Sequence, residues 1–263
     1  MTQSTDGPNS NTDIVTASVL VIGDEILSGR TKDKNVGYIA SHLDQMGIRL
    51  TEVRIVSDEA ADIVAAVDAL RSRYTYVFTT GGIGPTHDDI TADSIAAAFG
   101  VEISENEDAL DMLRRRHAEA DLNPGRRRMA RIPHGASLIE NKVSNAPGFQ
   151  IGNVFVMAGV PAVMHAMLDE LSPRLKGGRL LKVMTIDTDI KEGDAAIPLG
   201  EVQRRFEGVS IGSYPFFRDG AHGTVIVCRS IEEADLAAAA EAVVEAFRAV
   251  GAEAGIRRET GSD

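Results

Sequence analysis

The sequence predicts an α/β fold, a three-layer αβα sandwich with a mostly parallel sheet, followed by a small α+β module. Two observations predict the sandwich: short apolar runs recur along residues 15–175, and segments with helical spacing of apolar residues alternate with them. Such runs suit strands that are covered by helices on both faces. A third observation predicts the module, because the order after residue 179 changes to strand, helix, strand, strand, helix.

The first domain is expected to begin with a regular alternation of strands and helices. The expected elements are strands at 16–22, 48–56 and 74–78, and helices at 36–46, 63–70 and 90–99. Asp33 is a suitable N-cap for the first helix, Asn35 could cap it too, and Gly47 and Gly100 suit helix C-termini. The apolar spacing therefore predicts the helices, and the capping residues predict where they begin and end.

The rest of the first domain is less regular. Ser104 and Glu107 form a capping-box pair before a charged helix that we expect to run to about Asp121 and to end before Pro124. Strands at 137–139 and 154–157 and a helix at 161–171 follow. Residues 173–178 are the best candidate for a linker.

The second domain is expected at 179–252, with a KH-like topology, and residues 1–14 and 253–263 as disordered tails. Its strands are expected at 180–186, 209–213 and 224–228, and its helices at 194–206 and 232–250. Gly220 and Gly223 match the GxxG pattern of KH domains formally, but they lie between two expected strands instead of two helices. RNA binding is therefore not expected.

The composition favours a soluble protein that binds a small molecule. The 263 residues carry a formal net charge of −12, whereas nucleic acid and anionic membranes attract basic surfaces. The chain has one cysteine, Cys228, which cannot form a disulfide within the chain, so a reducing cytoplasm is expected. The apolar run around it predicts a buried strand thiol. No apolar stretch reaches the ~20 residues of a membrane span. We therefore expect no nucleic-acid or membrane partner.

The segment that carries most chemistry is Gly81-Gly82-Ile83-Gly84-Pro85-Thr86-His87-Asp88-Asp89, after an expected strand. Its glycines would let backbone N–H groups approach phosphate oxygens at the carboxyl edge of the sheet. Asp88 and Asp89 would repel a bare phosphate, so a divalent cation (Mg²⁺, Mn²⁺ or Co²⁺) is expected between them. The alternative is a tight turn with an aspartate N-cap.

A second acidic segment follows the first strand. Asp24 and Glu25, with Ser28 nearby, would leave the same sheet edge as Asp88 and Asp89 if the strands are parallel. We therefore predict these four carboxylates as catalytic residues and cation ligands; the alternative for Asp24 and Glu25 is helix capping and an exposed loop.

Weaker signals lie further along the chain. Asn145 and Gly148 belong to a turn, and Gly159 and Pro161 to a strand-to-helix junction that could offer free N–H groups or form an ordinary loop. Seven arginines between 114 and 131 could bind pyrophosphate, but the more common arrangement is a solvated helix face paired with nearby acids. The six histidines have no metal-site spacing.

At these motifs the chain resembles the molybdopterin-binding-like domain of the competence/damage-inducible protein A (CinA) family, which also forms the N-terminal part of eukaryotic FAD synthases. The resemblance rests on Gly23–Gly29, Asp33, Asn35, Tyr38–Ala40, Gly81–Thr91, Arg131–Ala136, Asn145–Phe149 and Gly159–Pro161, and it extends over roughly residues 15–250. Where competence proteins tend to read NPvGTAPG and PGVPxEM, this chain reads NKVSNAPG and AGVPAVM. The glutamate expected at Val163 is absent, which is closer to the FAD-synthase type.

The resemblance implies the fold of molybdopterin adenylyltransferases and cation-dependent hydrolysis of ADP-ribose or FAD, with release of AMP. It also implies that the nicotinamide-nucleotide deamidase domain of full-length CinA proteins and any FAD-synthetic domain are missing here. The ligand would be a nucleotide or pterin, and related domains commonly self-associate, so a homo-oligomer is expected. Two alternatives stay open: a molybdopterin binder or adenylyltransferase, and a nucleotide-binding regulatory module without catalysis.

Overall fold

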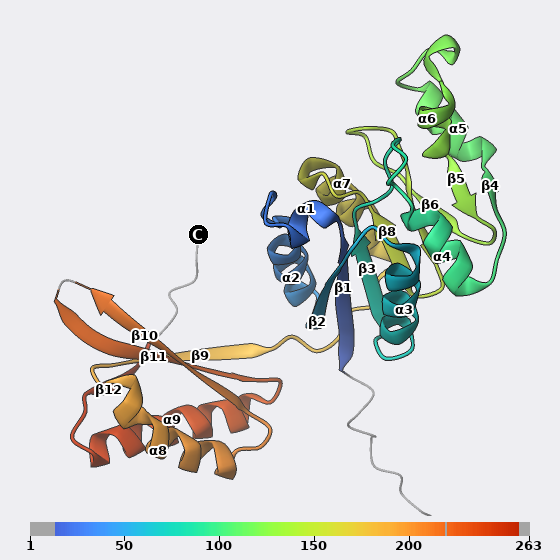
Figure 1. The fold of residues 1–263 in the computed structure, drawn as a ribbon. Helices are drawn as coiled ribbons and strands as arrows, with labels where there is room; N and C mark the ends of the chain where they lie inside the picture. The colour runs from blue at the N-terminus through green and yellow to red at the C-terminus, as the bar shows by residue number, and fades with distance from the viewer. Residues whose placement is uncertain (1–13, 219, 258–263) are drawn as a thin grey trace, which may run out of the picture. The chain divides into compact units, whose positions relative to one another are not determined.

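The structure is a computed structural model that describes residues 14–218 and 220–257, and it divides into two units at Arg179/Leu180 (Figure 1). The expected tail at 1–14 falls almost wholly outside the described residues. The N-terminal unit contains β1 (Val15–Ile22), α1 (Asp24–Leu27), α2 (Asn35–Gln45), β2 (Ile48–Val56), α3 (Ala60–Arg71), β3 (Tyr76–Thr80), α4 (Thr91–Phe99), β4 (Ile103–Glu105), α5 (Glu107–Arg114), η1 (Glu119–Asp121), α6 (Pro124–Arg128), β5 (Arg131–Pro133), β6 (Ser137–Ile139), β7 (Gly148–Ile151), β8 (Val154–Met157), α7 (Pro161–Leu171) and η2 (Ser172–Arg174).

The N-terminal unit is built on a six-stranded sheet of order β2-β1-β3-β8-β7-β6. The pairs β1–β2, β1–β3 and β3–β8 are parallel, and β7 runs antiparallel to both of its neighbours. The expectation of a mostly parallel sheet is confirmed. Because the four parallel strands point the same way, the segments that follow β1, β2, β3 and β8 all leave from one edge of the sheet.

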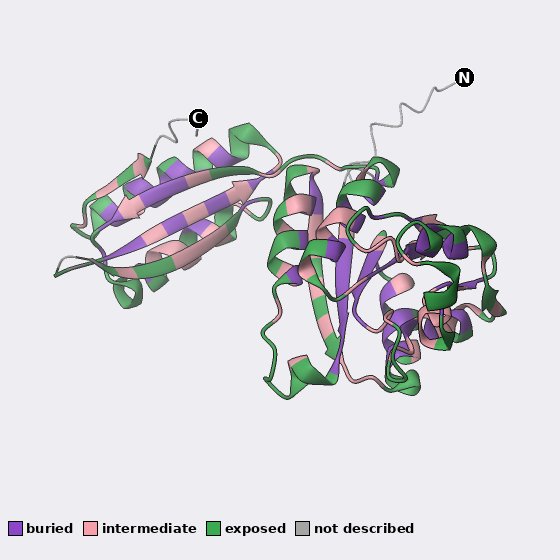
Figure 2. Cartoon of the chain, turned by 90° about the horizontal axis from the view of Figure 1, so that it is seen from above, coloured by how far each residue is buried: buried purple, intermediate pink, exposed green. Residues whose placement is uncertain are grey.

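Helices cover both faces of this sheet, as the sandwich prediction requires. Side chains alternate along β1: Leu20 packs in a core with α3 and α4, whereas Val19 and Val21 pack with α2 and α7. Figure 2 shows buried strands between helices whose outer surfaces are exposed. The strands read as continuous apolar runs because both of their faces are buried.

One part of the helix prediction is wrong. The charged helix ends at Arg114 and is capped by Asn106, whose side chain accepts the N–H of Ala109. Ser104 lies instead in β4, with its hydroxyl 2.9 Å from Nε2 of His134. Pro124 does not end a helix but begins α6, because proline suits the first turn and Asn123 caps it.

The predicted linker is folded onto the N-terminal unit. The side chain of Leu175 is buried in the core beside α7, and the N–H of Lys176 donates to the Tyr76 hydroxyl at 2.8 Å. The N–H of Gly178 donates to the carbonyl of Met46 at 3.1 Å. These contacts explain why the division between the units comes only after Arg179.

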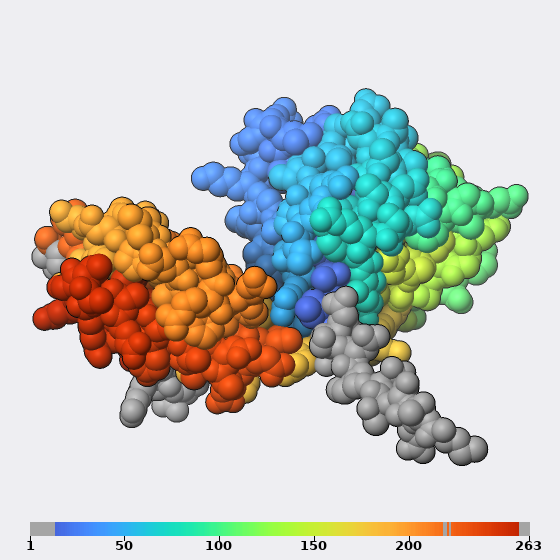
Figure 3. Space-filling model, turned by 90° about the horizontal axis from the view of Figure 1, so that it is seen from below, coloured from blue at the N-terminus to red at the C-terminus, as the bar shows by residue number. Residues whose placement is uncertain are grey.

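The C-terminal unit is a four-stranded antiparallel sheet of order β10-β11-β9-β12, packed against two helices. Its elements are β9 (Lys182–Thr188), α8 (Glu192–Arg205), β10 (Ser210–Arg218), β11 (Ala221–Ser230), α9 (Glu233–Ala249) and β12 (Ala254–Arg257). Cys228 is buried as expected, and burial raises the pKa of its thiol to about 11. In the space-filling view of Figure 3, this unit runs from orange to red and the N-terminal unit from blue to yellow.

The expected tail from residue 253 is wrong for β12, which pairs antiparallel with β9 through Ala254–Arg257. Its four residues have weak strand character, so pairing with β9 and not local sequence determines the strand. Residues 258–263 lie outside the described part. Across the described residues, no helix has both the length and the apolar character needed to cross a membrane.

Candidate functional site

The loop between β3 and α4 requires glycine at its first two positions. Gly81 and Gly82 have φ values of 104° and 66°, in the left-handed region that disfavours other residues. A Cβ at Gly81 would lie 2.1 Å from the carbonyl oxygen of Ile22, and one at Gly82 would lie 2.2 Å from Oγ1 of Thr91. Thr91 fixes the loop in return, since its hydroxyl donates to the carbonyl of Gly81 at 3.0 Å.

Of the backbone N–H groups of Gly81, Gly82, Ile83 and Gly84, one is used and three are not. The N–H of Gly81 donates to the carbonyl of Met157 at 3.2 Å, so Gly81 does not supply the phosphate-facing amide expected of it. Among the described residues, no acceptor takes the N–H groups of Gly82, Ile83 and Gly84. Successive free N–H groups of this kind form a concave site for an anion.

The two aspartates at the end of the loop have different environments. Oδ2 of Asp89 accepts the N–H of Thr86 at 2.8 Å and its hydroxyl at 2.5 Å, which closes the turn. Asp88 is exposed, and hydrogen bonding to the Thr86 side chain and to its own N–H lowers the pKa of Asp88. Because that hydroxyl has one proton, it serves one carboxylate at a time, and its geometry favours Asp89.

A cavity of about 650 Å³ lies in front of the loop. This volume is within the range of small-molecule sites. Loop residues, segments after β1 and β2, and the start of α7 line it together, so the carboxyl edge of the sheet forms one site. The predicted site residues that line it are Glu25, Gly81, Gly82, Ile83, Gly84, Asp88, Asp89, Gly159 and Pro161.

The remaining predicted site residues do not line this cavity: Asp24, Ser28, Thr86, Asn145 and Gly148. Ser28 ends the short helix α1, and Asn145 has a φ of 56° in the loop before β7. Gly148 lies in β7, where a Cβ would come within 2.3 Å of the carbonyl oxygen of Val156. Strand packing is therefore enough to explain that glycine.

Asp58 lines the cavity and was missed by the sequence reasoning. It follows β2 by two residues, and its Oδ2 accepts the N–H of Asp24 at 2.9 Å. Partial burial, followed by the negative charges of Asp24, Glu25 and Asp88, raises the pKa of Asp58 above its usual value. Its position at the carboxyl end of a parallel strand was the available signal.

The carboxylates around the cavity do not form a closed cation site. Within the described ranges, no group of three or more Asp, Glu, His or Cys residues has an arrangement that could hold a metal ion. Mg²⁺ is commonly bound by one or two carboxylates together with substrate phosphates and water. One or two of the carboxylates of Glu25, Asp58 and Asp88 would therefore need oxygen atoms from a ligand and from water to complete a cation site.

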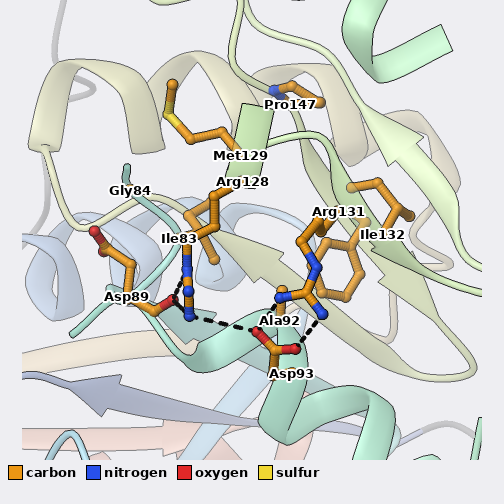
Figure 4. A pocket seen from close by; sticks show the side chains of 12 residues that line it. Ile83, Gly84, Asp89, Ala92, Asp93, Arg128, Met129, Arg131, Ile132 and Pro147 are labelled. Carbon is orange, nitrogen blue, oxygen red and sulfur yellow. Dashed lines mark hydrogen bonds and ion pairs between the residues drawn. The ribbon is translucent and has the colours of Figure 1, made fainter. Parts of the chain in front are cut away.

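Arginines brace the opposite side of the loop, beside a small cavity of about 10 Å³ (Figure 4). Nε and an Nη atom of Arg128 donate to the carbonyl of Asp89 at 3.2 and 3.1 Å. Arg131 makes a two-point pair with Asp93 at 2.7 and 3.0 Å. The other clustered arginines also have partners: Arg114 with Glu107, Asp111 and Glu119, Arg115 with Glu140, Arg127 with Glu105, and Arg116 and Arg126 with the carbonyls of Val143 and Asp121. The structure thus favours the paired helix face over a pyrophosphate clamp.

Asp33 and Asn35 have separate roles at the start of α2. Oδ1 of Asp33 accepts the N–H groups of Asn35 and Val36 at 3.1 and 2.8 Å, so the predicted cap is confirmed for Asp33. Asn35 does not cap the helix. Its Nδ2 donates to the carbonyl of Gly159 at 2.8 Å and joins α2 to the β8–α7 junction.

Comparison with known proteins agrees with this architecture. Residues 18–177 match the family described as a probable molybdopterin binding domain, and residues 181–253 match the FAD synthase middle domain. A CinA-like protein of Citrifermentans bemidjiense is 41% identical over 61% of this chain and 40% of its own length. A probable FAD synthase of Caenorhabditis briggsae is 32% identical over 76% of this chain and 43% of its own length. The chain thus spans less than half of each relative.

A solved structure gives the same result for the N-terminal unit. The crystal structure of the protein CinA with unknown function from Thermoplasma acidophilum is 35% identical, with a TM-score of 0.59 over 62% of this chain and 99% of that one. The family match covers residues 18–177, which include the loop and every predicted site residue. The chain therefore belongs to the family of molybdopterin-binding-like domains found in CinA-like proteins and FAD synthases.

Proposed function

We propose that this chain binds the diphosphate of an adenine dinucleotide, such as ADP-ribose or FAD, and hydrolyses it with release of AMP. The observation that carries the proposal is the pairing of two features in one cavity. The free N–H groups of Gly82, Ile83 and Gly84 can donate hydrogen bonds to a phosphate, and the carboxylates of Glu25, Asp58 and Asp88 lie around the same space. A bare phosphate would be repelled by these acids, so the arrangement supports a phosphate that arrives with a cation.

The residues of the chain have distinct tasks in this reaction. The loop N–H groups hold phosphate oxygens and stabilise the charge that develops on them during attack by water. Glu25 and Asp88 would hold a divalent cation together with those oxygens, and such a cation supplies Lewis-acid activation and a more acidic bound water. Asp58 lines the same cavity and has a raised pKa, so it would serve as the base that accepts a proton from the attacking water.

The test is the release of AMP. The purified chain is incubated with ADP-ribose or FAD and with Mg²⁺, Mn²⁺ or Co²⁺, and the products are separated by chromatography. We expect each dinucleotide to consume one water and to give AMP with a second product, which is ribose 5-phosphate from ADP-ribose and FMN from FAD. The absence of AMP in every combination would contradict the hydrolase and would favour the alternative of a regulatory module that has no catalytic activity.

A second function is favoured by one observation, the match of residues 18–177 to a family described as probable molybdopterin binding. A pterin with a terminal phosphate would use the same loop N–H groups, so the phosphate site does not separate the two functions. Calorimetry with molybdopterin and with ADP-ribose tests this alternative. Tight binding of molybdopterin, with no AMP released from the dinucleotides, would replace the hydrolase.

A further inference from the structure

The strand β2 forms one edge of the six-stranded sheet, and within residues 14–218 and 220–257 no strand pairs with its outer side (Figure 1). The carbonyl of Val56 accepts the N–H of Gly23, which follows β1, at 3.2 Å, so the backbone groups of Val56 point toward β1. Every second residue of a strand points its N–H and C=O groups to the same side. The backbone groups of Val53 and Ile55 therefore point outward, away from the sheet.

The outer edge of β2 lacks features that usually prevent an edge strand from pairing with another chain. Edge strands commonly carry lysine or proline, or bend at a bulge. Residues 52–56 contain neither lysine nor proline, and the irregularity in the pairing of β2 with β1, at Thr51, comes before them. The side chains of Val53 and Ile55 are each 42% exposed. An exposed apolar edge of this kind is a template for a further strand.

The two faces of this edge differ in chemistry. Val53 lies opposite Val19 of β1, so Val53 and Ile55 are on the face of the sheet that α2 covers. Glu52 and Arg54 are on the other face, where Nε of Arg54 donates to Oε1 of Glu52 at 2.5 Å. The edge therefore presents an apolar strip on one face, and one acid and one base on the other.

We propose that β2 pairs antiparallel with β2 of a second copy of this chain, about a twofold axis at Val53. Charge complementarity selects both the partner and the register. In this register Glu52 of each copy lies directly opposite Arg54 of the other, on the same face of the joined sheet. Moving the axis by one residue would place either the two copies of Glu52 or the two copies of Arg54 against each other, and like charges directly opposite are destabilising.

Pairing in this register joins the two six-stranded sheets into one continuous sheet. Val53 of one copy meets Val53 of the other on the apolar face, and Ile55 lies opposite Thr51 of the second copy. Because the two strands run in opposite directions, the carboxyl edges of the two copies, each with its loop Gly81–Asp89, point to opposite sides of the dimer. Val53 and Ile55 do not line the loop cavity, so the dimer does not depend on the proposed function.

Sedimentation of the full chain over a range of concentrations tests the dimer. Because one pair of strands buries little area, we expect a Kd of about 10–100 μM. Val53→Lys should weaken the dimer about 10-fold or more, because two ammonium groups would meet at the axis. Val183→Lys is the matched control, since Val183 is a strand residue of the C-terminal unit with 44% exposure. A dimer that Val53→Lys leaves unchanged, or that Val183→Lys weakens equally, overturns the proposal. A chain that stays monomeric at about 500 μM also overturns it and leaves the edge to a strand of a different protein.

Two charge variants test the complementarity of the strands. Arg54→Glu places acids opposite one another and Glu52→Arg places bases opposite one another, so each variant alone should associate about 10-fold more weakly. An equimolar mixture should recover the dimer, because one strand then carries two acids and the other two bases. Arg73→Glu is the control, because Arg73 also pairs with Glu52 within the chain, at 3.4 Å, but lies outside β2. A mixture of the two folded variants that stays monomeric, or an equal loss in Arg73→Glu, contradicts this pairing.

A pair of cysteine variants measures the register without changing any charge. The Cα atoms of the two copies of Val53 would lie about 5.5 Å apart, which a disulfide can bridge. Val53→Cys should therefore form a cross-linked dimer on mild oxidation. Ile55→Cys should not, although Ile55 is equally exposed, because its two copies would lie about 13 Å apart along the strands. Cys228 is buried and does not compete. Cross-linking of both variants, of neither, or of Ile55→Cys alone overturns the register.

Discussion

Acids lie on two sides of the loop Gly81–Asp89, and only those on one side are paired with arginines. On the arginine side, Asp93 pairs with Arg131, and the carbonyl of Asp89 is held by Arg128. On the cavity side, no lysine or arginine among the described residues lies within 4.0 Å of Glu25, Asp58 or Asp88. The paired charges hold the loop in shape, whereas the unpaired charges remain available to a ligand. The acids around the loop thus fall into two groups: those that hold its conformation and those that are free to contact a ligand.

The largest expected effect comes from neutralising acids on the cavity side. Glu25→Gln or Asp88→Asn should lower the rate of AMP release about 100- to 1000-fold, because each removes a charge that balances a cation and phosphate. Rates with ADP-ribose and Mn²⁺ measure this effect. Circular dichroism establishes that both variants remain folded.

Asp93→Asn is the matched change on the arginine side. It weakens the partly exposed pairs of Asp93 with Arg131 and Arg128, which costs about 1 kcal/mol and lowers Tm by about 2–4 °C, with less than a 5-fold change in rate. If folded Asp93→Asn loses as much activity as Asp88→Asn, the two sides of the loop are not functionally distinct.

The second effect concerns Gly81, the first residue of the loop. Gly81→Ala should destabilise the fold by about 2 kcal/mol more than Gly29→Ala. Both glycines have positive φ values, so both variants have backbone strain. Only at Gly81 does the new Cβ also meet a carbonyl oxygen, that of Ile22 at 2.1 Å, whereas nothing lies within 4 Å of Gly29. Urea denaturation of the two variants measures the difference; equal losses would show that the close contact relaxes at no cost.

The sequence predicted this edge of the sheet well because its signals are local. The bounds of β2 and α7 agree with those expected from apolar runs, from a glycine and from a proline at the first helical position. The loop after β3 was predicted from its three closely spaced glycines, because such spacing is typical of a tight loop. Where the residues determine the backbone directly, sequence is sufficient.

The residues that were not predicted depend on tertiary contacts. Asp58 precedes α3, where an acid has a local role at a helix N-terminus, and that role hides its position in the cavity. Arg128 reaches the carbonyl of Asp89 across 39 positions, a contact that no local pattern contains. Ser104 and Asn106 both suit an N-cap, and the pairing of β4 with β5 selects Asn106. The sequence thus predicts Glu25, Asp88 and Asp89 at the cavity, but not Asp58 or the distant partners of the loop.

The smallest effect, and the one that isolates the electrostatics of the cavity side, is that of Asp58→Asn on stability. The pKa of Asp58 is raised in the folded state, so ionisation of this carboxyl opposes folding above that pKa, and the opposition disappears below the unfolded value of ~3.9. Asparagine cannot ionise but can still accept the N–H of Asp24. Without divalent cations, Asp58→Asn should therefore raise Tm by about 1–2 °C at pH 7, and the gain should decline as the pH falls toward 4.

Asp88→Asn provides the opposite sign on the same side of the loop. The pKa of Asp88 is lowered, so its ionised form stabilises the fold above the unfolded pKa, and that stabilisation is lost as the pH falls through the folded pKa. The Asp88→Asn variant should melt slightly below the wild type at pH 7 and converge with it in acid. Calorimetric melting from pH 4 to pH 8 measures both variants. If Asp58→Asn gives no gain in Tm, repulsion among Asp24, Glu25, Asp58 and Asp88 would not explain why a cation should accompany the phosphate. If Asp88→Asn melts above the wild type, that repulsion outweighs the hydrogen bonds that lower the pKa of Asp88.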